Sequence, residues 1–341
     1  MKQLVYTPDD DIKVHEEGAI RLICRAFQSH ENGLPEWLKN SADAYAREDT
    51  AETGRVIVVI LENGRKGVHP SIACLDFAGM TSETIEQNFR IWADPEAAIR
   101  GGKAGFVQGG HGNGGKCYMT QMFEDFALIH AARRGQGNRY GVRAGSVRFG
   151  YIPNRAQGRD FVVSDIQEDL ETVLEETGCS VRALPKQAQE AFRLAQAFTL
   201  LRGVGPKGYG NKIPVLQIAA NLEEHPQMMR TLELCKVYLL ANGKLFNNGK
   251  PLDLPQIEPM ENAKEPRIIP IPELLRDPAS EHDISTTDTG KLPAGTLTLR
   301  TSKVSMRYGK KGRHNVVFRA RSGYIGYIPV PVTCPPFLVQ S

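Results

Sequence analysis

The spacing of hydrophobic residues predicts helices near the start of the chain. Ile20, Ile23 and Phe27 lie three or four positions apart within residues 17–28, which places them on one face of a helix. A second helix is predicted to begin at Pro35, because the first turn of a helix does not need the backbone N–H that proline lacks. The region before the first apolar run is therefore predicted to be helical.

Strands and helices follow one another through the rest of the sequence. Residues 116–132 are predicted to begin as a helix and to continue as a strand. Residues 251–294 hold many prolines without periodicity, which is typical of a linker or a long loop. The remaining predicted strands are residues 55–61, 71–77, 145–152, 159–166, 198–205, 295–308, 314–321 and 323–330, and the remaining predicted helices are residues 81–92, 183–198 and 222–235.

Length and composition favour a globular protein. The 341 residues suffice for two domains, and 41% of them are hydrophobic. No stretch approaches the roughly 18 to 20 apolar residues that span a bilayer, and no signal sequence is recognisable at the start. The six cysteines form no CxxC pair and lack a histidine at zinc-ligand spacing. We therefore expect a cytoplasmic protein with reduced thiols, no structural metal and no membrane partner.

Basic residues are concentrated in two parts of a chain whose net charge is only +3. Residues 131–159 contain seven arginines and no acid, and residues 295–341 contain eight lysines and arginines and no acid. One interpretation is a solvated surface balanced by the acidic residues 160–176. The other is a partner rich in phosphate, either a nucleic acid or a nucleotide.

Residues 108–116, QGGHGNGGK, have the spelling of a P-loop, since Gly110 is followed after four residues by Gly115 and Lys116. A P-loop also needs an apolar strand before it and a Ser or Thr after its lysine. The preceding stretch is polar and broken by glycines, and Cys117 stands where the hydroxyl is needed. These departures favour a glycine-rich lid of another kind.

Three polar residues share one stripe of the helix predicted from Pro35. Glu36, Asn40 and Asp43 stand at positions i, i+4 and i+7. A carboxylate there can accept a proton from a water molecule, and an amide oxygen can hold a magnesium ion that bridges phosphates. An ordinary exposed polar helix face is the alternative interpretation.

Asp76 closes an apolar run and is followed by Phe-Ala-Gly-Met, a sequence suited to a tight turn. A carboxylate at the end of a strand can accept a hydrogen bond from an exocyclic amine, such as that of adenine. The glycine-rich residues 108–116 follow later and lead into a predicted helix, whose first N–H groups can bind anionic phosphates.

The order of these motifs resembles the GHKL superfamily of ATPases, which includes gyrase B, MutL, heat-shock chaperones, MORC proteins and histidine kinases. The resemblance is specific over about residues 15–120 and looser to about residue 212. Its second motif departs from the usual DxGxG, being one residue short and lacking the first glycine. The motifs are Glu36-x-x-x-Asn40 with Asp43, then Asp76-x-x-Gly79-Met80, then Gly109-Gly-His-Gly112-Asn-Gly114-Gly-Lys116.

The resemblance implies a role for each residue of the first motif. Glu36 would be the general base that polarises the attacking water, and Asn40 would be the ligand of Mg²⁺. Asp43 would support the same polar network. Asn88, on the helix that follows the second motif, would contact the ribose or a phosphate.

The second motif would bind the adenine base. Asp76 would accept a hydrogen bond from the adenine amine, while Gly79 and Met80 would line the base pocket. A threonine on a late strand completes this site in the family. Thr199 is our candidate, and Thr296 is its rival.

The third motif would form the ATP lid. Its glycines would let the lid move, and the lysine at the start of the next helix would meet the phosphates. The residues concerned are Gly109, Gly112, Gly114, Gly115 and Lys116.

The resemblance also implies an α+β fold in two domains. Residues 1–212 would form a Bergerat-type two-layer α/β sandwich, with a mixed, largely antiparallel sheet and helices on one face. Residues 213–341 would form a smaller β-rich domain of the transducer type that contains the proline-rich residues 251–294.

A transducer lysine reaches the γ-phosphate in these relatives. Lys303 and Lys310 are the candidates for this catalytic role, and Lys311 is a further one. A basic β-turn is the alternative explanation of the same sequence.

The implied function is magnesium-dependent binding and hydrolysis of ATP. Closure of the lid would drive homodimerisation or another conformational change. The basic segments favour DNA as the client, in a defence or DNA-maintenance role, and a second protein subunit is also possible. Three alternatives stay open: a chaperone-like ATPase, a protein kinase of the histidine-kinase branch, and a module that senses ATP without hydrolysing it.

Overall fold

The computed structural model describes residues 14–48, 54–93, 113–152 and 159–254, together with four strands nearer the C-terminus. The helices are α1 (Glu16–Cys24), α2 (His30–Glu48), α3 (Ser82–Arg90), α4 (Gly114–Gln121), α5 (Ile166–Glu176), α6 (Lys186–Leu194), α7 (Val215–Glu224) and α8 (Met228–Leu234), with short 3-10 turns at Arg25–Phe27, Val181–Ala183 and Phe246–Gly249. The strands are β1 (Val56–Glu62), β2 (Ser71–Asp76), β3 (Phe123–Arg133), β4 (Gln136–Arg143), β5 (Asp160–Val162), β6 (Ala197–Pro206), β7 (Lys236–Ala241), β8 (Lys244–Leu245), β9 (Arg267–Ile271), β10 (Gly295–Leu299), β11 (Asn315–Ala320) and β12 (Gly323–Pro329).

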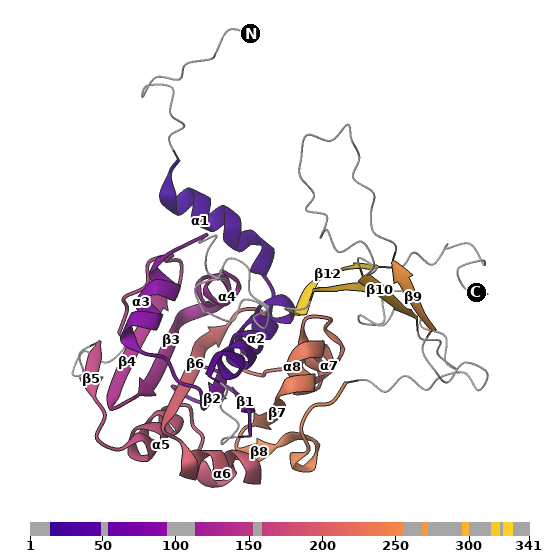
Figure 1. Ribbon diagram of the computed structural model, residues 1–341. Helices are drawn as coiled ribbons and strands as arrows, with labels where there is room; N and C mark the ends of the chain where they lie inside the picture. The colour runs from indigo at the N-terminus through magenta and orange to yellow at the C-terminus, as the bar shows by residue number, and fades with distance from the viewer. Residues whose placement is uncertain are drawn as a thin grey trace. The chain divides into compact units, whose positions relative to one another are not determined.

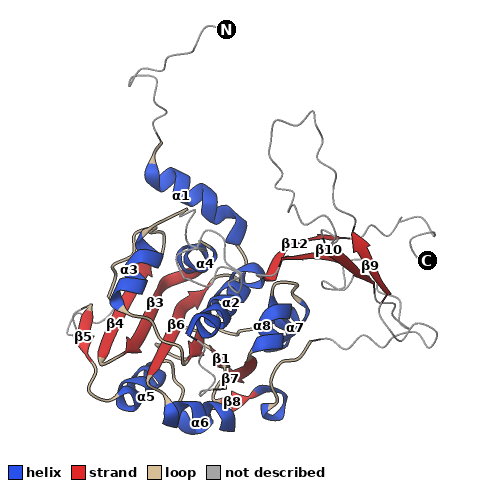
Figure 2. Ribbon diagram, viewed as in Figure 1, coloured by secondary structure: helices blue, strands red, loops and turns tan. Residues whose placement is uncertain are grey.

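One large mixed sheet organises the fold (Figures 1 and 2). Its eight strands run in the order β5-β4-β3-β6-β2-β1-β7-β8. Neighbouring strands are antiparallel except for β1 and β7, which are parallel. The predicted α+β class and the mixed, largely antiparallel sheet are therefore confirmed.

The sheet is buried on both faces, as β1 illustrates. Because successive side chains of a strand point to opposite faces, Ile57 and Val59 join one hydrophobic core while Val58 and Ile60 join another. The first core is completed by α2, α4, α7 and α8, and the second by α5 and α6. The prediction of helices on one face only is therefore wrong.

The missed helix α5 explains that error. Its Leu170, Val173 and Leu174 are buried at the spacing of one helical face. Asp165 caps the helix by accepting hydrogen bonds from two N–H groups of the first turn. These signals stand in a segment rich in acids, which the sequence analysis interpreted only as a source of negative charge.

Other differences from the predicted elements are local. Strand β4 (Gln136–Arg143) was not predicted, whereas residues 145–152 contain only an isolated bridge between Tyr151 and Gly141. The helix predicted at 222–235 consists of the end of α7 and all of α8, which are interrupted next to Pro226. Proline lacks the N–H that a continuous helix would need at this position.

The predicted domain boundary after residue 212 falls inside one compact unit, which comprises Met1–Leu254 and Asn315–Pro329. Strand β7 lies beyond that boundary, yet it pairs in parallel with β1 in the large sheet. Strand β9, within the predicted linker 251–294, pairs with β10, and β11 pairs with β12. Strands β10, β11 and β12 were thus predicted, whereas β9 lies where a linker or long loop was expected, and the transducer type of this region stays a prediction.

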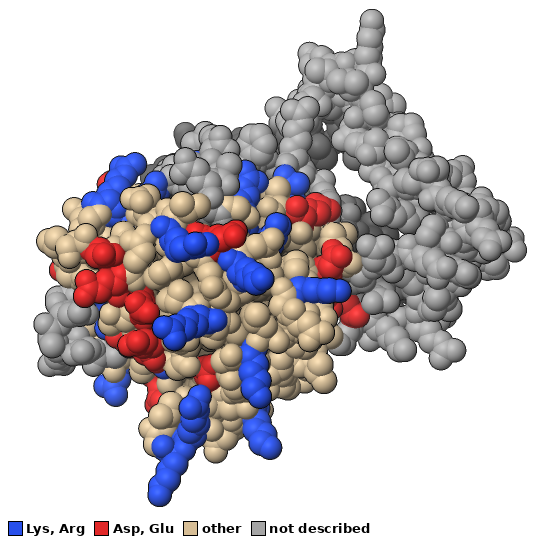
Figure 3. Space-filling model, turned by 90° about the horizontal axis from the view of Figure 1, so that it is seen from below, with Lys and Arg blue, Asp and Glu red and all other residues tan. Residues whose placement is uncertain are grey.

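Three arginines of residues 131–159 are paired with acids, but Arg139 is buried rather than solvated, and only Glu176 belongs to the acidic residues 160–176. The view in Figure 3 shows basic and acidic side chains interspersed over the described part of one face. The ion pairs are Arg139–Glu176, Arg148–Glu17 and Arg159–Glu86.

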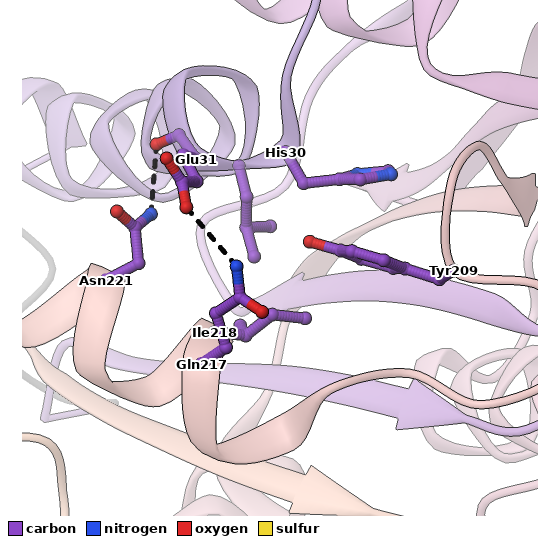
Figure 4. Close-up of a pocket in the computed structure, with 7 residues that line it drawn as sticks. His30, Glu31, Tyr209, Gln217, Ile218 and Asn221 are labelled. Carbon is purple, nitrogen blue, oxygen red and sulfur yellow. Dashed lines mark hydrogen bonds between the residues drawn. The ribbon is translucent and has the colours of Figure 1, made fainter.

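Helix α2 begins at His30, so the prediction that Pro35 opens the helix is wrong. Inside a helix, proline leaves the carbonyl four residues earlier without its usual partner. That carbonyl belongs to Glu31, and the side-chain amide of Asn221 on α7 donates to it at 3.0 Å (Figure 4). A contact from another helix therefore compensates for the proline.

None of the helices in the described part of the chain combines the length and the apolar character needed to cross a membrane.

Candidate functional site

The polar stripe of α2 is not an ordinary exposed helix face. Asp43 is buried, the side chain of Glu36 is only 13% exposed, and Asn40 is exposed. Carboxylates are rarely buried unless they have polar partners. The stripe therefore includes one accessible side chain, the amide of Asn40, and two carboxylates that are largely shielded from water. These two carboxylates need hydrogen-bond partners from neighbouring groups.

Both carboxylate oxygens of Glu36 accept hydrogen bonds. Lys39 Nζ donates to Oε2 at 2.8 Å from the next turn of α2. The side-chain amide of Gln227, which precedes α8, donates to Oε1. The two donors fix the orientation of the carboxylate. The i,i+3 spacing of Lys39 was a local signal in the sequence, but Gln227 is 191 residues away and gave none.

The first turn of α4 lies directly against Glu36 and Asn40. A Cβ atom at Gly114 would come within 2.3 Å of the Glu36 carboxyl carbon, and one at Gly115 would come within 2.8 Å of Asn40 Nδ2. Trp37 Nε1 also donates to the Gly115 carbonyl at 3.3 Å. A Cβ atom at either glycine would therefore displace the side chain of Glu36 or Asn40 from its observed position. The free N–H groups of a first helical turn favour anions nearby.

Asp76 ends β2 as a buried carboxylate with several donors. Ser41 Oγ donates to Oδ2 at 2.6 Å, and the backbone N–H of Ala78 donates to Oδ1 at 3.0 Å. Burial raises the pKa of Asp76, while hydrogen bonds from Ser41, Ala78, Gly79 and Thr199 oppose that rise. Ser41, the neighbour of Asn40 in sequence, therefore links the first and second motifs, a role that the sequence analysis missed.

Thr199 lies opposite Asp76 across the β2–β6 pair. Its side chain hydrogen-bonds the Asp76 carboxylate. The rival candidate, Thr296, is on β10 in the second compact unit. The structure thus brings together the predicted aspartate and the preferred threonine.

Gly79 is held by packing at the end of β2. Its φ of +71° is in the left-handed region, and a Cβ atom there would lie 2.5 Å from Ala197 Cβ and 2.7 Å from the Ala132 carbonyl oxygen. Met80 is half-buried beside the first core, and Asn88 is half-buried on α3. The close approach of the β3 and β6 backbone therefore explains the glycine at position 79 without a ligand.

Lys116 has contacts away from Glu36. The lysine is buried, its Nζ donates to the Ile91 carbonyl, and it lies 4.9 Å from the centroid of the Trp92 ring. These contacts join α4 to the segment after α3. Four predicted site residues, Gly109, Gly112, Lys303 and Lys310, lie outside the described residues, as does Lys311.

A histidine that the sequence analysis did not single out ties α2 to α4. His30 Nδ1 is 2.8 Å from Tyr118 Oη, and Nε2 is 3.0 Å from the Lys207 carbonyl oxygen. Since a carbonyl only accepts, Nε2 donates and Nδ1 accepts from the tyrosine hydroxyl. The ring stacks on Tyr209 with 4.4 Å between centroids. Burial lowers the pKa of His30 to about 4, so the ring is neutral at neutral pH.

A small pocket lies beside this histidine, between α2 and α7 (Figure 4). It has room for roughly one water molecule, and none of the predicted site residues lines it. Its lining residues are His30, Glu31, Leu34, Tyr209, Gln217, Ile218 and Asn221.

No protein-family model matches the chain, and no curated protein matches it. Among the described residues, no group of three or more His, Cys, Asp or Glu side chains is arranged to hold a metal ion. The arrangement of α2, α4 and the β2–β6 pair is therefore the observation from which a function has to be argued.

Proposed function

We propose that this protein is a magnesium-dependent ATPase with a GHKL-type nucleotide site. The contact between α2 and α4 is the observation that carries the proposal. Gly114 and Gly115 allow the first turn of one helix to approach Glu36 and Asn40 of the other. A carboxylate, an accessible amide and the N-terminal end of a helix are then combined in one place, as hydrolysis of a phosphoanhydride requires.

Glu36 acts as the general base in this proposal. Lys39 and Gln227 hold its carboxylate, so that an oxygen can take a proton from a water molecule as that water attacks the terminal phosphate. Asp43, buried one turn beyond Asn40, supports the polar stripe.

Asn40 is the proposed protein ligand of Mg²⁺. Magnesium typically takes only one or two protein ligands and completes its shell with phosphate oxygens and water. An exposed amide beside the first turn of α4 suits this role. When bound, the ion would neutralise charge on the phosphates; Lys116 and the lid glycines 109 and 112 complete the phosphate site in this proposal.

Asp76 and Thr199 form the proposed adenine end of the site. A buried carboxylate is stabilised by each hydrogen bond that it accepts, and the adenine amine can supply one. The hydrogen bonds of Asp76 to Ser41 and Thr199 support this assignment, because they hold the carboxylate at the end of β2. In this proposal Met80 and Gly79 lie beside the base, and Asn88 contacts the ribose or a phosphate.

The proposed cycle couples ATP turnover to a change of assembly. Closure of a lid over ATP favours a homodimer, and hydrolysis reopens it. A transducer-type region would contribute Lys303 or Lys310 to the γ-phosphate. DNA or a second protein subunit is the proposed client, in a cytoplasmic defence or DNA-maintenance role.

A phosphate-release assay with Mg²⁺ and ATP tests the proposal. We expect turnover that Asp76→Ala abolishes together with ATP binding, while Asp253→Ala, at an exposed aspartate, changes neither. Removal of a buried carboxylate can also unfold the chain. Circular dichroism therefore checks the fold of Asp76→Ala, and Thr199→Val serves as a second variant that removes a hydrogen bond to Asp76 without removing a charge.

ATP binding that survives Asp76→Ala in a folded protein would contradict the adenine assignment. Wild-type protein that binds ATP without releasing phosphate would be an ATP sensor. Turnover that DNA stimulates at low salt and not at high salt would identify DNA as the client.

A further inference from the structure

Two cysteines that are 93 residues apart in the sequence meet beneath α1. Cys24 ends α1 and Cys117 lies in α4, and their Sγ atoms are 3.0 Å apart. Both side chains are fully buried. Thr120 Oγ1 also donates to Cys24 Sγ, at 3.6 Å. The two thiols therefore face each other from different helices, with a hydroxyl donor beside them.

The surroundings of the pair favour a negative charge on Cys24. Its pKa is lowered, first by the hydrogen bond from Cys117 and then by Thr120, Lys116 and Arg21, although burial acts in the opposite direction. The pKa of Cys117 is raised by the same hydrogen bond and by burial. Cys24 is thus the more acidic thiol of the pair, and its thiolate, once formed, is the nucleophile.

The other described cysteines lack this arrangement. Burial raises the pKa of Cys179 and of Cys235 to about 12, and it raises the pKa of Cys74 still further. Cys117 also has a raised pKa, but its sulfur lies 3.0 Å from that of Cys24, whereas these three thiols contact no other thiol among the described residues. These three cysteines therefore provide internal controls for the reactivity of the pair.

We propose that Cys24 and Cys117 are a redox-active dithiol, which a peroxide converts reversibly into a disulfide between α1 and α4. The Cys24 thiolate attacks one peroxide oxygen, an S–O bond forms, the O–O bond breaks, and the leaving hydroxide takes a proton to become water. The Cys117 sulfur then attacks the sulfenic acid at Cys24. An S–S bond forms, the S–O bond breaks, and the second oxygen leaves as water with the Cys117 proton. Two thiols lose two electrons in total, and hydrogen peroxide is reduced to two water molecules.

Oxidant reaches the pair through α1. This helix has only nine residues, and its Arg21 and Leu22 are exposed on the outer side. Short elements with few buried contacts open locally at low free-energy cost. The two Sγ atoms are 3.0 Å apart, so they need to approach by only about 1 Å to reach the ~2.05 Å of a disulfide.

The bond would connect the end of α1 to the helix that carries Gly114 and Gly115. The proposal does not depend on ATP hydrolysis, because the cross-link and its effect on stability can be measured without nucleotide. A covalent link across 93 residues restricts the unfolded chain and so stabilises the folded one.

The test is oxidation of the full-length native protein by hydrogen peroxide, followed by alkylation of the remaining thiols, digestion and mass spectrometry. We expect a disulfide-linked peptide pair that contains Cys24 and Cys117, reversed by dithiothreitol, while Cys74, Cys179 and Cys235 stay available to the alkylating agent after denaturation. The melting temperature should rise by several degrees on oxidation. Cys24→Ser and Cys117→Ser should each abolish both effects, and the matched Cys179→Ser and Cys235→Ser should retain them.

Two results would overturn the proposal. One is a native protein in which Cys24 and Cys117 stay reduced until the chain itself unfolds. The other is a set of cross-links distributed over all cysteines, with Cys179→Ser as damaging as Cys24→Ser. Should a serine variant fail to fold by circular dichroism, the wild-type peptide masses and the change in melting temperature still decide the question.

Discussion

Buried charges occur on both faces of the central sheet, but they have different surroundings. On the face covered by α5, His130 is 1% exposed; its Nε2 is 2.9 Å from Asp169 Oδ2, and its Nδ1 accepts from Arg139 Nε at 2.8 Å. Arg139 Nη2 also donates a hydrogen bond to Glu176 Oε1 at 2.5 Å. Arg139 therefore faces the carboxylate of Glu176, while the neutral ring of His130 accepts from Arg139 and donates to Asp169, so each of these groups has a hydrogen-bond partner.

On the α2 face, Glu36 has its donors too, but it lies beside an exposed amide and two glycines. The first turn of α4 brings further N–H groups to the same place. On the α5 face the polar groups hydrogen-bond one another, and Glu176 at the end of the network is exposed. On the α2 face an accessible amide and the N-terminus of α4 adjoin the carboxylate instead. The comparison teaches that burial of a charge alone does not identify a site.

Removing one carboxylate from each face tests the comparison most strongly. We expect Glu36→Gln to leave ATP binding intact and to lower turnover by about 100-fold or more, because a general base contributes roughly 10²–10⁴ in rate. Glu176→Gln should leave turnover unchanged. Phosphate release and nucleotide binding, measured on both variants, check this; equal turnover of Glu36→Gln and wild type would remove Glu36 from the mechanism.

The α5 face should respond in stability instead. His130→Ala leaves Asp169 and Arg139 without their shared partner, and breaking a buried polar network of this kind costs about 3 kcal/mol. Urea unfolding measures the loss. Arg148→Ala, at an exposed ion pair with Glu17, is the control and should change stability by less than about 1 kcal/mol. A loss at His130 no larger than at Arg148 would mean that the network contributes little.

The pH dependence of stability sharpens the comparison at His30. Its pKa is about 4 in the folded protein and 6.5 when unfolded, so the unfolded chain binds the proton first as the pH falls. The contribution of the neutral ring is complete above pH 6.5, and it declines toward pH 4 by about 3 kcal/mol, since each pKa unit is worth about 1.4 kcal/mol.

His30→Gln should flatten that dependence, and urea unfolding of both proteins between these pH values measures the difference. Using the difference removes the contributions of other buried groups, such as Asp76, whose raised pKa acts in the opposite direction. Identical pH profiles for the two proteins would contradict a neutral buried histidine.

The smallest expected effect concerns the contact that compensates for Pro35. Asn221→Ala removes the donor to the Glu31 carbonyl and should cost about 1 kcal/mol, the usual value of one hydrogen bond. Gln217→Ala, one turn earlier on α7 with a 3.4 Å contact to the Glu31 carboxylate, is the control and should cost less. Thermal unfolding distinguishes them; equal losses would mean that the carbonyl does not need the amide.

Elements whose signals are local were predictable from sequence. The apolar runs of β1 and β2 and the Thr81 cap of α3, which accepts from Thr84 N–H at 3.2 Å, occur where they were expected. The second sheet face was not predictable, because the buried stripe of α5 is hidden among acids. Strand β4 was missed because its glycines and polar residues resemble a loop until β3 and β5 pair with it.

The candidate site also has features that the sequence predicted and features that only the structure shows. The sequence by itself predicted the candidate residues: Glu36 and Asn40 by helical spacing, Asp76 by its place after an apolar strand, and the glycines by their density. Only the tertiary structure decided that Gln227 orients Glu36, that Thr199 lies beside Asp76, and that Cys24 meets Cys117. The reason is physical: helical and strand periodicity act over a few residues, whereas these contacts join segments that only the packing of helices on a sheet brings together.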